Sequence, residues 1–323
     1  MKIGIIGTGK ISANFFDAAR RVDGIAATAL LSRDAARGAE FARAHGGMTV
    51  YTDPNAFFSS GIDAVYVANP NSAHFDSAAA ALVAGKHVLL EKPATDTAEK
   101  FARLCRLADE RGCVLMEAMR PLHLPFLEKV RKMLPEIGKI RRVTLEYCQY
   151  SSRYDAFRAG EVKNAFNPAL SNAALMDIGV YPAAVAMALF GAPQTVKAQS
   201  VFLSNGFEGA GEALLGYDGF TLSLVWSKIA DSVTPSVFMG EEGTLLLDRV
   251  NGPTEATLIL RNGATRVLRN EPCENDMVYE IADFAAAAAG KKSALPYRRI
   301  SEITLTLLDR IRAEAGIAFP ENA

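Results

Sequence analysis

Short runs of apolar residues alternate with alanine-rich segments of helical period over the first 120 residues. Strands that are apolar on both faces are typical of a parallel sheet covered by helices. Strands are predicted at 2–6, 26–31, 64–67, 87–90 and 114–116, and helices at 11–21, 35–44, 72–84 and 97–111. The pattern therefore predicts an α/β fold with an N-terminal, doubly wound Rossmann domain.

The pattern changes near Arg120, after which Pro121, Pro125 and Pro135 bracket a single helix. Alternating β-like runs separated by Gly, Asn and Asp turns then predominate, and helical periods return near the end. Strands are predicted at 139–150, 219–227, 243–247, 256–260 and 265–268, and helices at 276–289 and 300–313. We therefore expect a Rossmann dinucleotide-binding domain over residues 1–120 and an α+β substrate-binding and dimerisation domain with a mainly antiparallel, open sheet over residues 121–323.

Composition narrows the range of partners. The 35 basic and 36 acidic residues nearly cancel, which favours a small-molecule ligand over nucleic acid or an anionic membrane. Glycines interrupt the N-terminal apolar run too early for a signal peptide. The four cysteines form no Cys-x-x-Cys pair, and the four histidines lack the spacing of metal ligands. These features predict a cytoplasmic protein without a structural metal.

A glycine turn joins the first predicted strand to the first predicted helix, with the residues Gly7, Thr8, Gly9, Lys10 and Ile11. Gly7 permits a tight turn, and Gly9 lets the backbone approach a pyrophosphate at the helix N-terminus. Ser12 stands at the third glycine position of the dinucleotide fingerprint, so an ordinary strand-to-helix turn is the alternative. The position of the turn, at the start of a βαβ series, favours dinucleotide binding.

The second predicted strand is followed by Ser32, Arg33 and Asp34, where NAD-binding folds usually place an acid against the ribose. A hydroxyl and a guanidinium suit a 2′-phosphate, so NADP is the expected cofactor and NAD remains possible. The alternative is that Ser32 or Asp34 caps the next helix and that Arg33 is solvated.

The strand predicted at 64–67 is followed by Asn69, Pro70 and Asn71, with His74 a little further on. Ligands bind in the crevice at the carboxyl ends of parallel strands, so these residues are expected to border the nicotinamide ribose. For His74, a local packing or capping role is an equally good interpretation.

Residues 85–93 read GKHVLLEKP, and this segment makes a family resemblance specific. Together with GTGKI at 7–11, NPN at 69–71, MEA at 116–118 and DIGVY at 177–181, it resembles the glucose–fructose oxidoreductase, inositol dehydrogenase and MocA (Gfo/Idh/MocA) family over the whole chain. The resemblance implies that Lys92 is catalytic and that the Lys92–Pro93 peptide bond is cis. Lys92 would hold a substrate oxygen beside the nicotinamide, and Glu91 would orient its ammonium group.

Asp177 and Tyr181 lie four residues apart, so in a helix they share one face. Pro182 is expected to kink or end that helix at Tyr181. Many relatives carry His at this position, and this chain resembles the branch with Tyr, which includes dimeric dihydrodiol dehydrogenases. In that branch Tyr181 would exchange the hydroxyl proton while Lys92 stabilises the alkoxide, and Asp177 would bind a second substrate hydroxyl. A core tyrosine and a surface aspartate are the alternative.

One segment departs from the family pattern, because residues 171–174 read SNAA where relatives often carry two glycines. A polar and aromatic stretch precedes it, with Arg153, Tyr154, Asn164, Phe166 and Asn167. Its length suits a substrate-side loop, although surface packing explains each residue equally well.

The function expected from these residues is hydride transfer between a nicotinamide and a secondary alcohol or carbonyl of a sugar, polyol or diol. A non-catalytic regulator that senses NAD(P) is an alternative with the same fold, and an NAD-retaining lyase or glycosidase is another. The open sheet of the second domain favours a homodimer or a higher homo-oligomer.

Overall fold

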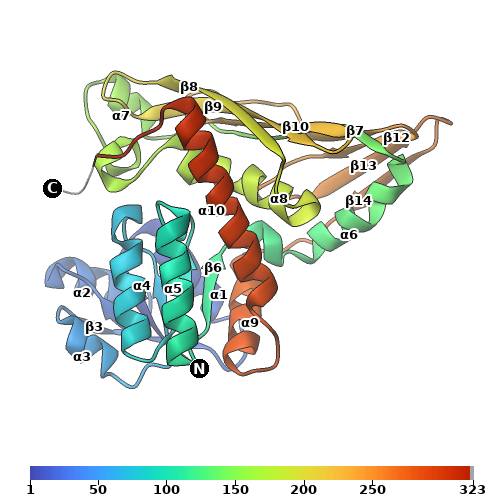
Figure 1. The fold of residues 1–323 in the computed structure, drawn as a ribbon. Helices are drawn as coiled ribbons and strands as arrows, with labels where there is room; N and C mark the ends of the chain where they lie inside the picture. Colours follow the sequence, from blue (N-terminus) through green and yellow to red (C-terminus); the bar gives the residue numbers. More distant parts are fainter. Residues whose placement is uncertain (321–323) are drawn as a thin grey trace. The chain divides into compact units, whose positions relative to one another are not determined.

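The computed structural model describes residues 1–320 and divides the chain into two compact units (Figure 1). The first unit comprises Met1–Arg120 and Cys273–Glu302, and the second comprises Pro121–Pro272 and the residues from Ile303 onward. The sequence pattern predicts that every residue after 120 belongs to the second domain. The return of Cys273–Glu302 to the first unit corrects that boundary.

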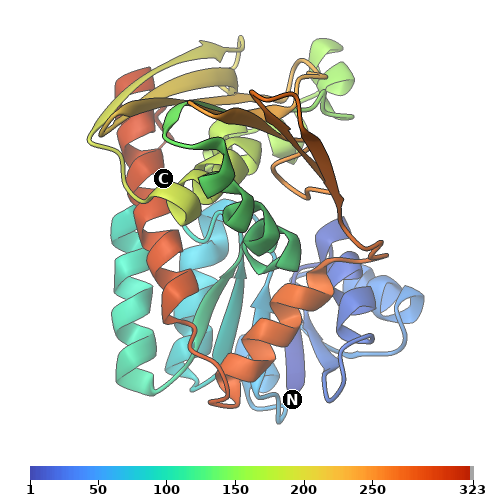
Figure 2. The same ribbon diagram turned by 90° about the vertical axis from the view of Figure 1, so that its right-hand side faces the viewer.

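The first unit is built on a parallel sheet of six strands in the order β3-β2-β1-β4-β5-β6. The strands are β1 (Lys2–Ile6), β2 (Ala26–Leu31), β3 (Thr49–Tyr51), β4 (Ala64–Val67), β5 (His87–Glu91) and β6 (Leu115–Ala118). The helices are α1 (Lys10–Ala19), α2 (Ala35–Ala44), α3 (Pro54–Phe58), α4 (His74–Val83), α5 (Ala98–Arg111) and α9 (Met277–Ala288). Figure 2 shows helices on both faces of this sheet. The predicted Rossmann architecture is therefore confirmed.

Strand burial explains why the pattern of this sheet could be predicted. All four residues of β4 and all four of β6 are buried, as expected for strands covered on both faces. Two elements, β3 and α3, were not predicted. They contain only three and five residues, which is too short for a periodic pattern to develop.

Helix α9 explains the corrected boundary. Met277, Ile281 and Phe284 are buried in the same apolar cluster as Ile3 and Phe15 of the first unit. The helix therefore completes the core of the Rossmann sheet although it follows the second unit in the sequence. No local pattern carries this information, because an amphipathic helix does not specify which core it covers.

The second unit is built on an eight-stranded sheet in the order β14-β13-β12-β11-β7-β10-β9-β8. The strands are β7 (Ile140–Cys148), β8 (Thr195–Phe202), β9 (Glu208–Tyr217), β10 (Phe220–Ser227), β11 (Ser236–Gly240), β12 (Gly243–Leu247), β13 (Glu255–Leu260) and β14 (Thr265–Arg269). Every neighbouring pair is antiparallel except β7 with β10, which is parallel. The prediction of a mainly antiparallel sheet is therefore confirmed.

Helices lie along one face of this sheet (Figures 1 and 2). They include α6 (Pro125–Met133), α7 (Tyr154–Arg158), α8 (Val180–Phe190) and the end of α10 (Leu295–Ala315). Side chains on strands alternate between the two faces, and exposed apolar residues mark the outer one. They include Val201, Leu214, Met239, Ile259 and Val267.

Helix α8 follows directly on a π-helical turn, Leu175–Gly179. Pro182 lies in the first turn of α8, directly after the π-helical turn, and α8 continues past it to Phe190. The expectation that Pro182 ends the helix at Tyr181 was therefore wrong, and the alternative of a kink stays a prediction. The helical segment Pro168–Phe190 is long and apolar enough to cross a membrane, but 72% of its 18-residue apolar window is buried inside the protein, so one such segment is weak evidence for a membrane span.

Candidate active site

The parallel sheet of the first unit brings the predicted cofactor-binding residues to one edge. Strands β1 and β4 pair with Ile6 opposite Val67, and β4 and β5 pair with Val67 opposite Leu90. The segments after these strands therefore leave the sheet side by side. These segments begin with Gly7, Ala68 and Lys92. The edge has the geometry of a crevice for an extended ligand.

The turn between β1 and α1 can accept a dinucleotide only because of its two glycines. Gly7 has a φ of +119°, and a Cβ at this position would lie 2.5 Å from the carbonyl oxygen of Ala68. Gly9 precedes α1 without a side-chain cap, and a Cβ there would meet no protein atom within 4 Å. The free space and the uncapped amides of Lys10 and Ile11 fit a pyrophosphate. Ser12, at the third fingerprint position, is fully buried.

The three residues after β2 have different surroundings. The Asp34 side chain accepts a hydrogen bond from the amide of Arg37 at 3.1 Å and so caps α2. The Ser32 hydroxyl donates to the carbonyl oxygen of Asp34 at 2.7 Å, and Arg33 is exposed. The alternative interpretation of Asp34 as a cap is therefore confirmed, whereas Arg33 has the exposure that a phosphate ligand requires.

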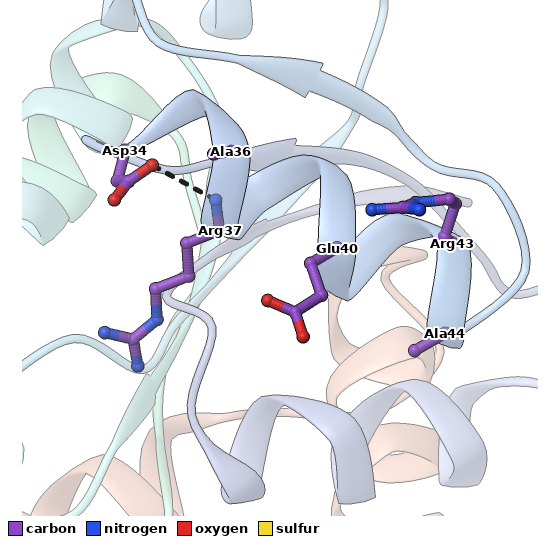
Figure 3. A pocket seen from close by; sticks show the side chains of 6 residues that line it. All are labelled: Asp34, Ala36, Arg37, Glu40, Arg43 and Ala44. Carbon is purple, nitrogen blue, oxygen red and sulfur yellow. Dashed lines mark hydrogen bonds between the residues drawn. The ribbon is translucent and has the colours of Figure 1, made fainter.

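Arg37 is a candidate that sequence reasoning missed. It stands in the first turn of α2, three residues after the Asp34 cap, and its side chain is exposed. Figure 3 shows its side chain beside a surface hollow that Asp34, Glu40 and Arg43 also line. Strands β2 and β5 are three strand spacings apart, about 14 Å at roughly 4.8 Å per spacing. That separation suits the two ends of a dinucleotide.

His74 is a structural residue of this edge. It is 1% exposed, and its Nδ1 and Nε2 atoms lie 2.9 Å from the carbonyl oxygens of Pro93 and Asn69. Burial lowers the pKa of His74, and a neutral ring can donate to only one of these oxygens. These contacts support the local packing role, because the ring joins the loop after β4 to the loop after β5, and the predicted contact of His74 with the cofactor stays a prediction.

Lys92 follows β5, is half-buried and forms a cis peptide bond with Pro93, as the family resemblance implied. The loop after it is fixed by the amide of Ala94, which donates to Glu117 at 2.8 Å. Burial raises the pKa of Glu117. The loop that follows Lys92 in the chain is thus held in place by the hydrogen bond between Ala94 and Glu117.

Glu91 lies beneath Lys92 and was predicted to orient its ammonium group. It is buried and accepts hydrogen bonds from the Tyr66 hydroxyl at 2.5 Å and from the Lys92 amide at 3.2 Å. Burial raises the pKa of Glu91, and the positive charge of Lys92 acts in the opposite direction. Glu91 therefore anchors the Lys92 backbone from inside the protein, and its predicted contact with the cofactor stays a prediction.

The second unit holds the other two predicted catalytic residues on one continuous helical segment. Asp177 lies in the π-helical turn, and Tyr181 lies in the first turn of α8. The Asp177 carboxylate is 2.7 Å from the ammonium of Lys228. The Tyr181 ring packs edge to face against Tyr147, with ring centroids 5.7 Å apart. Both side chains are partly exposed.

Residues that were not predicted hold this segment in place. The buried carboxylate of Glu208 accepts from the Leu175 amide at 2.8 Å and from the Trp226 indole at 2.7 Å. Burial raises the pKa of Glu208. A Cβ at Gly179 would lie 3.0 Å from the Trp226 ring, so glycine allows the turn to rest on the sheet. Such long-range contacts leave no local signal in the sequence.

The segment that departs from the family pattern takes a defined conformation. Ser171 has a φ of +55°, and within residues 1–320 it is the one non-glycine residue with a positive φ. The Asn172 side chain donates to the carbonyl oxygen of Asn164 at 2.7 Å. Of the residues before it, Phe166 is buried and Asn167 caps a short helical turn. These observations support packing roles for both.

Comparison with known proteins agrees with this geometry. Residues 1–119 match the family described as "Oxidoreductase family, NAD-binding Rossmann fold", and residues 127–246 match the Gfo/Idh/MocA C-terminal domain. The chain is 39% identical to the scyllo-inositol 2-dehydrogenase (NADP(+)) of Bacillus subtilis, covering 100% of this chain and 99% of that protein. It is 32% identical to a D-xylose 1-dehydrogenase (NADP(+)) of Haloferax volcanii over 61% of this chain and 60% of that protein.

A solved structure is also similar over nearly the whole chain. It is a 3-ketoreductase from Actinomadura kijaniata in complex with NADP and TDP-benzene, with a TM-score of 0.88, 28% identity and 98% of each chain covered. The fold, the family models and these relatives together define a nicotinamide-dependent oxidoreductase. The chain belongs to the Gfo/Idh/MocA family, as its sequence motifs indicated.

Proposed function

We propose that this enzyme uses NADP to oxidise a secondary hydroxyl of a polyol or sugar, or to reduce the corresponding carbonyl. The observation that carries the proposal is the placement of Lys92 directly after β5, at the sheet edge that also holds the Gly7–Gly9 turn. A nicotinamide bound along this edge would accept a hydride from the carbinol carbon, or return one to the carbonyl carbon.

The cofactor would be held by residues that follow β1, β2 and β4, at the carboxyl ends of the parallel strands. The amides after Gly9 would bind the pyrophosphate, and Asn69 and Pro70 would border the nicotinamide ribose. Arg33 and Arg37 would bind a 2′-phosphate, because two exposed guanidinium groups follow β2 where an acid would favour NAD. Ser32 would join them only by turning its hydroxyl away from the carbonyl oxygen of Asp34. The NADP-dependent relatives support this choice of cofactor.

The remaining chemistry falls to three side chains. Lys92 would stabilise negative charge on the substrate oxygen, and Tyr181 would exchange the proton of that oxygen with solvent. Asp177 would accept a hydrogen bond from a neighbouring substrate hydroxyl. Solved forms of the similar 3-ketoreductase include variants of one lysine and of one tyrosine, the two residue types to which this proposal assigns the substrate oxygen and its proton.

The substrate test is a panel of cyclic polyols and aldoses with NADP and with NAD. We expect reduced nicotinamide to accumulate with NADP and scyllo-inositol, because the Bacillus subtilis relative that is similar over the whole chain is a scyllo-inositol 2-dehydrogenase (NADP(+)). Product formation without a net change in nicotinamide absorbance would indicate a lyase or glycosidase. Cofactor binding without any product from the panel would favour a regulator.

We also propose a homo-oligomer that forms through the outer face of the eight-stranded sheet. Apolar side chains such as Leu214 and Ile259 are 49% and 41% exposed on this face, and a second copy would bury them. Analytical ultracentrifugation should give a dimer or larger species, and Leu214→Lys should weaken it. A monomer at all concentrations would contradict the proposal.

A cytoplasmic location is likewise proposed. Cys105, Cys113, Cys148 and Cys273 are all free thiols, which suits a reducing compartment. Fractionation of the native cells, with thiol alkylation of the extracted protein, tests it.

A further inference from the structure

Lys228 is a buried lysine in the second unit. It follows β10 directly and is 4% exposed. Its amide donates to the carbonyl oxygen of Gly209 at 2.9 Å, and its own carbonyl oxygen accepts from the amide of Ser151 at 2.9 Å. Lysine is seldom fully buried unless its charge is paired, so the surroundings of its ammonium group identify what it does.

Two oxygens and two aromatic rings surround this ammonium group. The Nζ atom lies 2.7 Å from Oδ2 of Asp177 and donates to the carbonyl oxygen of Ala165 at 3.0 Å. It also lies 5.0 Å from the ring centroid of Phe166 and 5.4 Å from that of Phe207. The rings exclude water and favour the cation, which strengthens the attraction between the ammonium group and the Asp177 carboxylate.

The ion pair is asymmetric in its exposure. The side chain of Lys228 is 5% exposed, whereas that of Asp177 is 38% exposed. The lysine therefore approaches the carboxylate from the protein interior, and a large part of the carboxylate still faces solvent. A ligand can reach Asp177 from outside without displacing Lys228.

The backbone around Asp177 is held by other residues. Glu208 binds the Leu175 amide and the Trp226 indole, and Gly179 rests against Trp226. These contacts fix the π-helical turn without help from Lys228. Within this turn, Lys228 therefore acts on the charge and direction of the Asp177 carboxylate, and its other hydrogen bond, to Ala165, lies outside the turn.

We propose that Lys228 is a positioning residue that holds Asp177 as an anion in one orientation, so that Asp177 accepts a hydrogen bond from the substrate. This inference rests on the proposed function, in which Asp177 binds a substrate hydroxyl. A carboxylate paired with an ammonium group is a poorer proton acceptor than an unpaired one. Proton exchange is thereby left to Tyr181 and Lys92, and Asp177 contributes to substrate selection.

The test compares Lys228→Met with Lys197→Met in the full-length enzyme, using NADP and the best substrate of the panel. Lys197 is a matched control in the same unit, because it also pairs with an acid, Glu314 at 3.1 Å, but is 78% exposed. We expect Lys228→Met to raise the KM for the substrate by about tenfold or more, since a charge-assisted hydrogen bond loses its geometry. The kcat of Lys228→Met should change less than its KM, and its affinity for NADP should not change. In Lys197→Met, the KM, the kcat and the affinity for NADP should all equal those of the unmodified enzyme.

A second pair of variants separates positioning from simple loss of structure. In an Asp177→Asn background, Lys228→Met should have little further effect on KM, because its partner is already neutral. Lys228→Arg should recover part of the affinity lost in Lys228→Met. An unchanged KM in Lys228→Met, or an equal loss in both backgrounds, would overturn the inference. Absence of turnover by the unmodified enzyme on every substrate would instead overturn the proposed function, and the role of Lys228 with it.

Discussion

The hydroxyl of Tyr66 donates a 2.5 Å hydrogen bond to the buried carboxylate of Glu91, the residue directly before Lys92. Tyr66 is itself fully buried and stacks on Phe15, with ring centroids 3.8 Å apart. The catalytic lysine of the proposed mechanism is thereby connected through Glu91 to the apolar core of the Rossmann unit. The precision of its placement depends on residues that never contact a substrate.

Tyr66→Phe should therefore lower turnover without weakening cofactor binding. The change removes the hydroxyl that orients Glu91 while leaving the packing on Phe15 intact. If the whole free energy of this buried hydrogen bond serves to place Lys92, its loss should reduce kcat by about five- to tenfold. Steady-state kinetics and an NADP titration measure both quantities.

Tyr217→Phe is the matched control for this variant. The Tyr217 hydroxyl donates to the carbonyl oxygen of Gly191 at 2.9 Å, in the second unit and on strand β9. Tyr217→Phe should lower the free energy of unfolding about as much as Tyr66→Phe does, and it should leave kcat unchanged. Equal kcat values for the two variants would show that Glu91 needs no help from Tyr66.

NADP should bind more tightly than NAD. Arg33→Ala and Arg37→Ala should each weaken NADP binding and so reduce the difference in affinity between the two cofactors. Both arginines are exposed at the start of α2, where each would supply a charged donor to the 2′-phosphate. Arg43→Ala is the control, because Arg43 lines the same hollow but stands in the last turn of α2. Titration of both cofactors decides the point, and a preference that survives both substitutions would place the phosphate elsewhere.

Glu280→Gln should stabilise the protein in a manner that depends on pH. Glu280 is 1% exposed, its Oε2 atom has no hydrogen-bond partner, and burial raises its pKa well above the ordinary value of 4.5. The folded protein therefore holds a proton that the unfolded chain releases, so stability falls as the pH rises above 4.5. The substitution removes this loss.

Chemical denaturation at pH 5 and at pH 8 measures the effect. The gain from Glu280→Gln should be larger at pH 8 than at pH 5. Glu274→Gln is the control, because Glu274 is an exposed acid that pairs with Arg21 at 2.6 Å and should matter little at either pH. A gain that is the same at both values would mean that Glu280 does not titrate in this range.

Much of the first unit could be predicted from the sequence because its signals are local. The strands at 2–6, 26–31 and 64–67 were predicted with the bounds that the structure has, since each is an apolar run between turn residues. The glycine turn and the residues 91–93 also carry their chemistry in adjacent positions. The fold class and the family followed from these signals.

The supports of the site could not be predicted, because each depends on residues that meet only in the folded chain. Tyr66 and Glu91 lie on neighbouring strands, and Lys228 reaches Asp177 only through the placement of β10 beside the π-helical turn. Helix α9 joins the Rossmann core from beyond the second unit. The sequence leaves His74 between a cofactor contact and local packing, because only the folded chain buries its ring between the carbonyl oxygens of Pro93 and Asn69.

The central claim is that Lys92 and Tyr181 handle the substrate proton together, and it is tested most directly by the kcat of Lys92→Met, Tyr181→Phe and the double variant. With scyllo-inositol and NADP, or the best pair from the panel, each single variant should lose about a hundredfold or more in kcat with NADP affinity nearly intact. The double variant should be little worse than either one, as for residues that act as a unit. Near-normal turnover in Tyr181→Phe would assign the proton to another group, and near-normal turnover in Lys92→Met would contradict the mechanism as a whole.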